Sequence, residues 1–264
     1  MTLPRLGRAS SYALLMLALL TLPACAGASY VTPGRGADMS AFGVSQGQRE
    51  LLTDSGVQSK LDLKPLAQFP TGLAIVRVQA PGYRSYTCGN SYGSGRYSVV
   101  TTRDVESDQS IAQLQKLPLV TGVAPLNRLL LPEQLNSDQE LRQAAAALHA
   151  DLLLIYTIDT TFQSDNGSVT LSVVSLGFLP TEVSRVTTTV SAALLDTRNG
   201  YVYAVAESTA KDDTLSSPWV DEAAVDRLRR RTEGQAFDKL IGDFGRAWTG
   251  VINTYALKAQ PNNG

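Results

Sequence analysis

The sequence predicts an α/β fold in which helices pack on one face of a mixed, largely antiparallel sheet, with a long C-terminal amphipathic helix among them. Three observations lead to this prediction. Apolar runs alternate with two short helical segments in the first half of the chain, and β-rich runs follow one another directly in the second half. From residue 221 onward, apolar residues recur at steps of three and four, so the last segment should form a helix that lies across the sheet.

Three runs in the first half are typical of strands: Leu73–Val78, Tyr97–Thr102 and Ala150–Phe162. The third contains four consecutive aliphatic residues, so we expect it to be the most buried. A helix should lead straight into it, because Ser137 and Glu140 have the spacing of a capping box and an alanine-rich stretch follows them. The helix and the strand together form an αβ unit.

A second short helix is predicted over Ser107–Lys116. Pro118 should end it, because proline lacks the amide hydrogen that a continuing helix needs. An extended segment, Leu119–Leu131, is expected to follow.

The second half contains three β-rich runs, Ser168–Leu179, Ser184–Leu195 and Tyr201–Thr209. Pro180 separates the first two, and the Asn199-Gly200 pair before the third favours the positive φ of a tight hairpin turn. In the middle run, apolar residues alternate with Thr and Ser. One face of the sheet is therefore expected to be solvated or to bind a partner.

The amino terminus has the pattern of a secretory signal peptide, which we assign to residues 1–24. Arg5 and Arg8 form a positively charged region, and Tyr12–Leu22 is an apolar run of about eleven residues. A helix needs about 20 apolar residues to span the hydrocarbon of a bilayer, so this run is too short for a permanent span. We expect it to be removed.

The stretch Leu22-Pro23-Ala24-Cys25 resembles the bacterial lipobox, in which a small residue precedes a cysteine that is acylated before cleavage. The resemblance implies that Cys25 is the lipid attachment site, where each buried methylene of a palmitate chain adds about 0.8 kcal/mol of membrane affinity. Ala26, rather than Asp, follows the cysteine, which implies the outer membrane and a domain that faces the periplasm. An ordinary secretory signal, which would leave a soluble protein, is the alternative.

Composition divides the remainder into two parts. Residues 25–49 are rich in Gly, Ser and Ala and should form a flexible tether, whereas residues 50–264 should form a single periplasmic α/β domain. Residues 1–24 contain two of the 23 basic residues and no acidic ones, so 21 basic and 24 acidic residues remain, with a net charge of −3. This charge provides no basic footprint for nucleic acid, and we expect no such partner.

Candidate catalytic residues are few. His149 is the only histidine, which excludes a metal site with two imidazoles in one chain, and we expect it to cap a helix end. No family signature surrounds Cys88, so a catalytic Cys88–His149 pair is not expected. The carboxylates of Asp151, Asp159 and Asp196 should bond backbone amides at strand edges and turns. We therefore predict no catalytic residue, no metal and no cofactor, and a protein that is not an enzyme.

Four tyrosines surround a glycine-rich segment, Gly89–Gly95; they are Tyr83, Tyr86, Tyr92 and Tyr97. The segment lacks the lysine and hydroxyl of a phosphate-binding loop, and it should form the tip of a hairpin. Exposed tyrosines bury a large area at a small entropic cost, so these four are candidates for a partner-binding surface. Cross-strand packing of the same rings is the alternative.

Four arginines between residues 227 and 231 form a basic run on the predicted terminal helix. We expect them to be solvated and to pair with Asp226 and Glu233. Contact with lipid headgroups or with an acidic partner is the alternative.

Two stretches, "LRQAAAALHADLLLIYTIDT" and "VSAALLDTRNGYVYAVAEST", resemble a superfamily of periplasmic lipoproteins. It includes the curli secretion lipoprotein, the penicillin-binding-protein activator lipoproteins and the amino-terminal domain of TolB. The resemblance covers residues 70–255 and lies in Ala150-Asp151 at a strand start and in the "LLD...G" turn that ends at Gly200. Members form pores, activate enzymes or assist envelope assembly, so the fold alone does not select a function.

These observations favour a lipid-anchored envelope lipoprotein on the periplasmic face of the outer membrane. We expect it to contact the membrane through its N-terminal lipid and to bind an envelope protein without catalysis. An oligomeric secretion pore resembling the curli channel is the alternative; it requires a homo-oligomer and paired strands of about 9–11 residues, for which Ser168–Leu179 and Ser184–Leu195 are long enough. An enzyme of unrecognised type is the third hypothesis.

Overall fold

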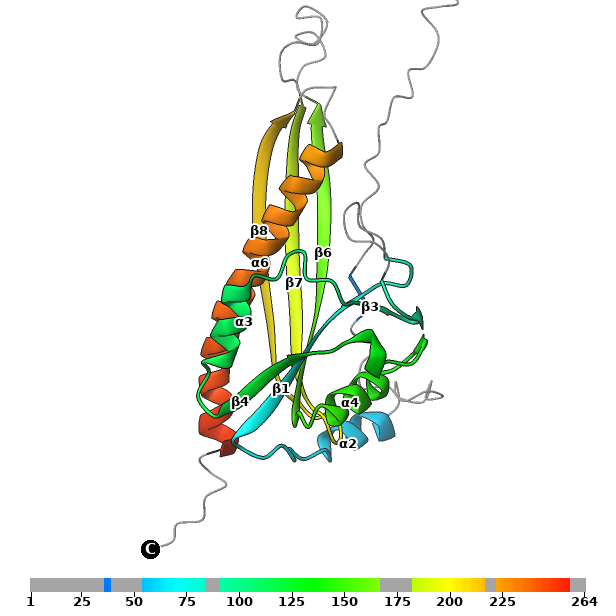
Figure 1. Cartoon of the computed structure of the whole chain (residues 1–264), viewed down its shortest axis with the longest axis vertical. Helices are drawn as coiled ribbons and strands as arrows, with labels where there is room; N and C mark the ends of the chain where they lie inside the picture. The colour runs from blue at the N-terminus through cyan, green and yellow to red at the C-terminus, as the bar shows by residue number, and fades with distance from the viewer. Residues whose placement is uncertain (1–35, 39–53, 84–90, 167–181, 217–221, 257–264) are drawn as a thin grey trace, which may run out of the picture. The chain divides into compact units, whose positions relative to one another are not determined.

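A computed structural model of the chain describes residues 36–38, 54–83, 91–166, 182–216 and 222–256. They form a mixed, largely antiparallel sheet with a long C-terminal helix packed across it, which confirms the predicted α/β fold class (Figure 1). Cys25, Tyr86 and Cys88 lie outside the described residues.

Strand β1 (Thr71–Gln79) joins the parallel and antiparallel parts of the sheet. On one edge it pairs in parallel with β6 (Leu152–Asn166). On the other edge it pairs with β3 (Ser98–Val100), which is antiparallel, and with β4 (Val120–Pro125), which is parallel. The three predicted strands of the first half are therefore present in β1, β3 and β6.

The sheet continues from β6 into β7 (Glu182–Asp196) and then β8 (Val202–Ser216), all antiparallel. Gly200, in the turn before β8, has a φ of 75°, as the Asn-Gly pair predicted. β7 pairs with β6 on one edge and with β8 on the other along its length, and the predicted run Ser168–Leu179 lies outside the ranges that the structure describes. Residues 167–181 lie outside the described residues.

The predicted helices begin where their capping signals lie. The Ser137 hydroxyl accepts from a backbone amide of the first turn and the Glu140 carboxylate accepts from the Ser137 amide, so the capping box is formed. At the start of the shorter helix, the Ser107 hydroxyl likewise accepts from a backbone amide, that of Ser110. The described helices are α2 (Asp54–Leu61), α3 (Asp108–Gln115), the 3₁₀ turn η3 (Arg128–Leu130), α4 (Asp138–Ala147), α6 (Glu222–Val251) and its π-helical end η4 (Ile252–Ala256). Two further short strands, β2 (Ser94–Gly95) and β5 (Gln134–Leu135), pair with each other.

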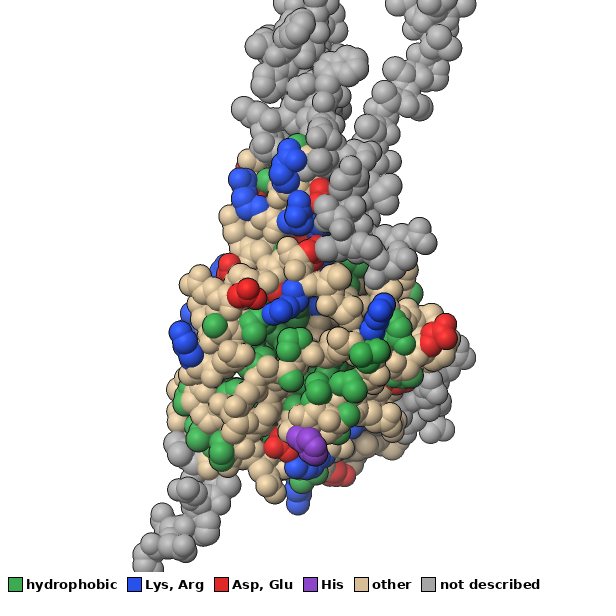
Figure 2. All heavy atoms as spheres, viewed as in Figure 1, with side chains coloured by type: hydrophobic (Ala, Val, Ile, Leu, Met, Phe, Trp, Pro, Cys, Tyr) green, Lys and Arg blue, Asp and Glu red, His purple; other side chains and the backbone are tan. Residues whose placement is uncertain are grey.

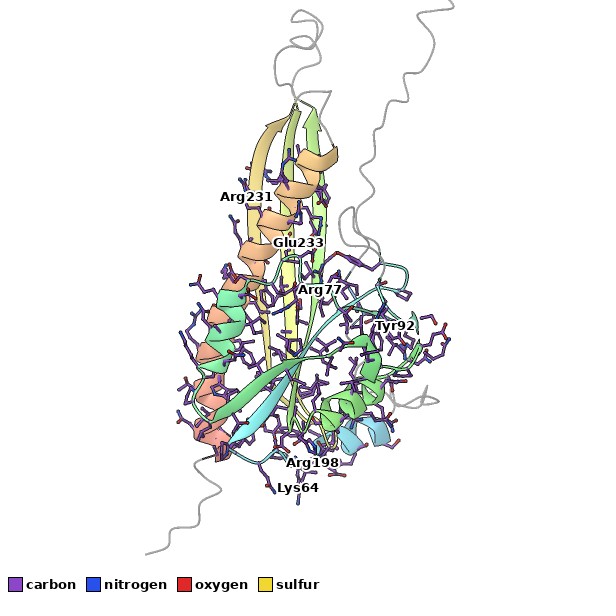
Figure 3. The ribbon with its side chains drawn as sticks, in the orientation of Figure 1. Lys64, Arg77, Tyr92, Arg198, Arg231 and Glu233 are labelled. Carbon is purple, nitrogen blue, oxygen red and sulfur yellow. The ribbon has the colours of Figure 1, made fainter. Side chains whose placement is uncertain are left out.

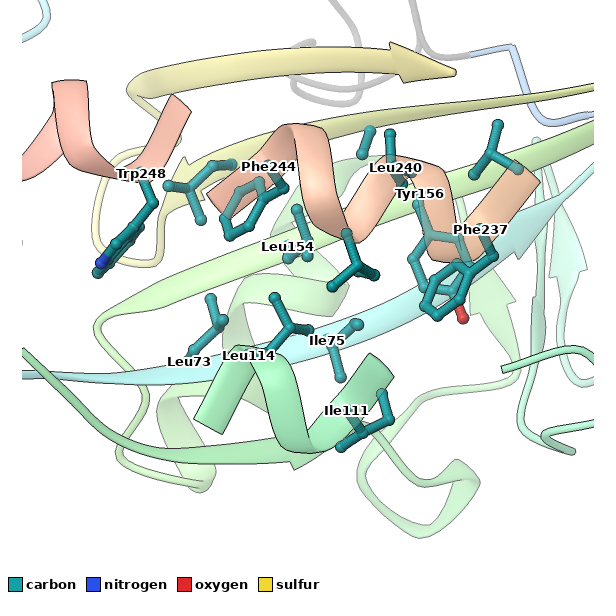
Figure 4. Packing of buried hydrophobic residues seen from close by; sticks show 14 of the residues in the cluster. Leu73, Ile75, Ile111, Leu114, Leu154, Tyr156, Phe237, Leu240, Phe244 and Trp248 are labelled. Atoms are coloured by element: carbon teal, nitrogen blue, oxygen red, sulfur yellow. The ribbon is translucent and has the colours of Figure 1, made fainter. Parts of the chain in front are cut away.

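Apolar residues fill the space between the sheet and helices α3 and α6 (Figure 4). This first cluster takes one side of β1 and β6 and the inner side of α6. Its members include Leu73, Ile75, Ile111, Leu114, Leu154, Tyr156, Phe237, Leu240, Phe244 and Trp248.

A second apolar cluster lies on the opposite face of β1 and β6, where α4 packs. It contains Ala74 and Val76 of β1, Leu153 and Ile155 of β6, and Leu141 of α4. The prediction placed the helices on one face, and α4 is the exception. The reason is that β1 and β6 are aliphatic at successive positions, so both of their faces need cover.

No helix in the described ranges combines the length and the hydropathy that a membrane crossing needs.

Candidate functional site

The described candidate catalytic residues are His149, Asp151, Asp159 and Asp196. The chain's only histidine lies on the surface (Figure 2) with a positive φ of 56°, directly after the C-terminal end of α4, where its amide donates to the Ala146 carbonyl at 2.9 Å. Asp151 pairs with Arg198 at 2.6 Å. Asp159 is exposed within β6. Within the described ranges, no group of three or more His, Cys, Asp or Glu side chains could hold a metal ion.

Asp196 is the aspartate that bonds backbone amides most extensively. It is fully buried, and its Oδ2 accepts from the amides of Leu66 and Ala67, each at 2.7 Å, while its Oδ1 accepts from the Arg198 amide at 2.9 Å. Tyr203 also donates its hydroxyl to Oδ2, at 3.0 Å. Asp196 therefore holds the segment before β1 against the β7–β8 turn. Its buried carboxylate is not accessible to a substrate.

The predicted tyrosine surface is not formed by the tyrosines that the structure describes. Tyr83 is 3% exposed and Tyr97 is fully buried, with its hydroxyl donating to the Ser137 carbonyl at 2.7 Å. Tyr92 is half-buried and donates to the Leu131 carbonyl at 3.0 Å. Tyr92 and Tyr97 therefore bond to segments about 40 residues further along the chain. Their expected exposure failed because the segments that cover them are distant in the sequence.

A buried cluster of charges lies between β1 and α6, and only its ion pairs within α6 were predicted (Figure 3). Arg77, on β1, places Nη1 3.0 Å from Asp104 and 3.6 Å from Glu106, and Nη2 3.7 Å from Glu233 of α6. Arg229 contacts Glu233 Oε2 at 2.6 Å. All five side chains are at most 8% exposed, so we refer to them, with Asp226, as the buried charge cluster.

Further hydrogen bonds lie within the buried charge cluster, two of them from neighbouring hydroxyls. Tyr156 donates to Glu106 at 2.7 Å, Thr160 donates to Glu233 at 2.9 Å, and Asp226 accepts from Arg229 Nε at 3.0 Å. Pairing of this kind is what makes buried charges tolerable.

The cavity beside the cluster has a volume of about 30 Å³, close to that of one water molecule. Arg77, Glu106 and Tyr156 are among its lining residues. A cavity of this size is too small for a metabolite. The cluster therefore joins β1, the β3–α3 segment and α6, and it is not a ligand pocket.

Arg229 corrects the prediction for the basic run on the terminal helix. It pairs with Asp226 and Glu233 as expected, but it is fully buried and not solvated. Two signals pointed to the cluster: a lone arginine inside the apolar strand run that contains Arg77, and acids three and four residues from Arg229 on the helix.

The buried phenols predict a loss of stability at alkaline pH. Burial raises the pKa of Tyr83 to about 12, and burial together with the neighbouring Glu106 carboxylate raises the pKa of Tyr156 well above its usual value. An unfolded chain ionises the same phenols near pH 10, so it binds fewer protons than the native state above that pH. We therefore expect the contribution of these phenols to the free energy of unfolding to be constant below pH 10. It should fall as the pH rises from 10 to 12. Urea unfolding at a series of pH values checks this; a constant urea midpoint across that range would contradict it.

One surface of the sheet is left without cover by the described residues. On β7, Val190, Ala192 and Leu194 face α6, so the intervening Thr189, Ser191 and Ala193 face the other way. No helix in the described ranges packs over that side of β7 and β8. The predicted alternation of a buried face and a half-polar face is therefore present.

A shallow depression of about 280 Å³ lies on these two strands. Val205 beside it is 73% exposed, although it is a large aliphatic residue in a strand. Glu207 accepts a hydrogen bond from Ser191 at 2.8 Å. We call this surface the β7–β8 face; its depression is lined by Ser191, Ala192, Ala193, Val205, Ala206 and Glu207.

Charged side chains of α6 lie over the outer edge of β8, but not over the β7–β8 face. β8 is the last strand of its sheet, and Lys239 of α6 donates to the Thr209 carbonyl at 3.3 Å. Arg231 of α6 contacts Asp212 of β8. Charged groups over an edge strand prevent further strand pairing, so the face is the better binding surface.

Neither a protein-family model nor a curated protein sequence matches the chain. Its structure is similar to protein XCC0632 from Xanthomonas campestris, at 16% identity over 72% of this chain and 90% of that one, with a TM-score of 0.35. It is also similar to lipoprotein GNA1162 from Neisseria meningitidis, at 12% identity over 63% and 97% of the two chains and a TM-score of 0.27. A PelC dodecamer from Paraburkholderia phytofirmans matches at 12% identity over 67% and 91%, with a TM-score of 0.23. With every TM-score below 0.5, these likenesses transfer no activity and no assembly to this chain.

Proposed function

We propose that this chain is a lipid-anchored envelope lipoprotein that faces the periplasm from the outer membrane and acts by binding a protein partner, without catalysis. The β7–β8 face is the observation that carries the binding role. It combines an apolar depression, a strongly exposed valine and a carboxylate on the side of β7 and β8 that no described helix covers.

The chemistry of the β7–β8 face selects the kind of partner. Val205 and Ala193 offer apolar contact, and Glu207 offers a negative charge whose hydrogen-bond partner on the chain is a neutral serine. A protein that presents an apolar side chain with a basic side chain beside it complements both features.

The anchor is supported by the amino-terminal sequence. A charged region, a short apolar run and Cys25 follow one another in the order that lipoprotein signals require. Acyl chains on Cys25 would hold the domain at the membrane surface, where an envelope partner is within reach.

A photo-crosslinking residue at position 205, in cells that express the full chain, tests the binding role. We expect a discrete adduct from Val205 that Glu207→Lys abolishes, because the reversed charge repels the basic partner. Position 129 is the matched control, since Leu129 is 86% exposed on η3, outside the β7–β8 face. An adduct of twice the chain's mass would identify the partner as a second copy. Equal adducts from both positions, or none from position 205, would contradict the proposal.

A further inference from the structure

Three residues of the predicted tether, Gly36–Asp38, lie against the sheet. Gly36 forms an isolated antiparallel bridge with Gln79, the last residue of β1. The Ala37 amide donates to Thr157 Oγ1 of β6 at 2.7 Å. Ala37 is 8% exposed and belongs to the second apolar cluster. This contact lies eleven residues after Cys25 and well before α2.

The contact is made where β1 and β6 diverge. The two strands pair only as far as Val76 and Ile155. Beyond that point the Gln79 side chain replaces the missing strand pairing, since it donates to the Ile158 carbonyl at 2.9 Å and accepts from the Ile158 amide at 3.0 Å. Ser98 of β3 pairs with one edge of Gln79, which leaves the other edge for Gly36. We call the site formed by Gln79, Thr157 and Ile158 the strand fork.

The strand fork is built to accept a backbone amide. The Thr157 hydroxyl donates its one hydrogen to Gln79 Oε1 at 2.9 Å, so toward Ala37 it can act only as an acceptor. With the segment in place, Thr157 is 6% exposed and Gln79 is 1% exposed. The hydrogen bonds that join Gln79 to Thr157 and Ile158 do not involve the segment. A Cβ on Gly36 would lie 3.0 Å from Thr157 Oγ1 and 3.6 Å from the Ile158 carbonyl, which explains why a glycine occupies this position.

We propose that the strand fork is a docking site for the lipid-bearing end of the chain, and that docking sets the reach of the anchor. This consequence for reach rests on the proposed acylation of Cys25. Eleven residues span at most about 40 Å and, if flexible, about 18 Å on average. The 29 residues from Cys25 to Asp54 would average about 30 Å and extend to about 100 Å if nothing held them. Docking at Gly36 therefore holds the domain close to the bilayer.

Limited trypsin digestion tests the docking, because Arg35 directly precedes Gly36 and Arg49 lies in the same predicted tether. We expect cleavage after Arg35 to be at least about tenfold slower than after Arg49, since a docked segment must open before a protease can bind it. Gly36→Leu should remove the protection, and Gly43→Leu, the same change within the segment but away from the fork, should keep it. Equal cleavage at both arginines in the unmodified chain would overturn the docking.

The digestion separates this inference from the proposed function, because it can be repeated on the full chain with Cys25→Ser. Docking predicts the same protection with or without acyl chains.

Matched insertions test the reach in vesicles that carry the acylated protein. Fifteen Gly/Ser residues inserted after Ala28 should reduce energy transfer from a dye at position 129 to acceptors on lipid headgroups. The same insertion after Gly43, beyond the docked residues, should leave the transfer unchanged. Equal reductions from both insertions would overturn the inference.

Discussion

Replacement of Arg77 by Met is expected to lower the free energy of unfolding by about 3–5 kcal/mol, because it removes the cation that faces Asp104, Glu106 and Glu233 while their carboxylates stay buried. An uncompensated buried charge costs more than the pair itself contributes. Arg77→Lys keeps the charge but has a single terminal nitrogen, which cannot occupy the positions of both Nη1 and Nη2, so its loss should be intermediate. Urea unfolding of the purified domain measures the free energy of unfolding of the unmodified protein and of the two variants.

Arg231→Met is the matched control for this substitution. The Arg231 side chain is 60% exposed and forms an ion pair with Asp212. Exposed ion pairs contribute at most about 1 kcal/mol, so the control should unfold near the urea concentration of the unmodified protein. If the two variants lose equal stability, the buried charge cluster does not hold α6 to the sheet.

Trp248→Ala is expected to cost about 3–5 kcal/mol, which is typical for removal of a large buried side chain that leaves a cavity. Trp248 is fully buried, its ring lies 6.0 Å from that of Phe69, and its Nε1 donates to the Pro118 carbonyl at 2.9 Å. The loss therefore includes a hydrogen bond as well as apolar contact. Because Trp248 lies near the end of α6, the C-terminal turns of that helix should lose protection from hydrogen exchange first.

Leu129→Ala is the control for the core substitution, since Leu129 is 86% exposed and the change should alter stability by less than about 0.5 kcal/mol. Thermal unfolding followed by circular dichroism compares the two variants. A Trp248→Ala protein as stable as the control would contradict the packing of α6 described above.

Elements with local signals could be predicted from the sequence. The Ser137–Glu140 capping box and the Asn-Gly turn depend on residues a few positions apart, and both are formed. The pairing of β7 could not be predicted in the same way, because its neighbours are chosen by contacts across the whole sheet. The sequence therefore indicated strands at 184–195 and 201–209 but not the two neighbours between which the first of them lies.

The sites were less predictable than the fold, for a related physical reason. Burial of Arg229 depends on Arg77 and Asp104, which lie more than a hundred residues away, so its helix face could not be inferred from a run of arginines. Gly36 and Ala37 lie in a stretch whose composition is typical of a linker, and their docking depends on Thr157 of β6. In each case a residue's surroundings are supplied by distant segments.

Mass spectrometry of the mature protein from native envelopes tests the proposed lipid anchor. We expect a chain that begins at Cys25, lacks residues 1–24 and carries the added mass of acyl chains on that cysteine. An intact, unacylated amino terminus upstream of Cys25 would contradict it.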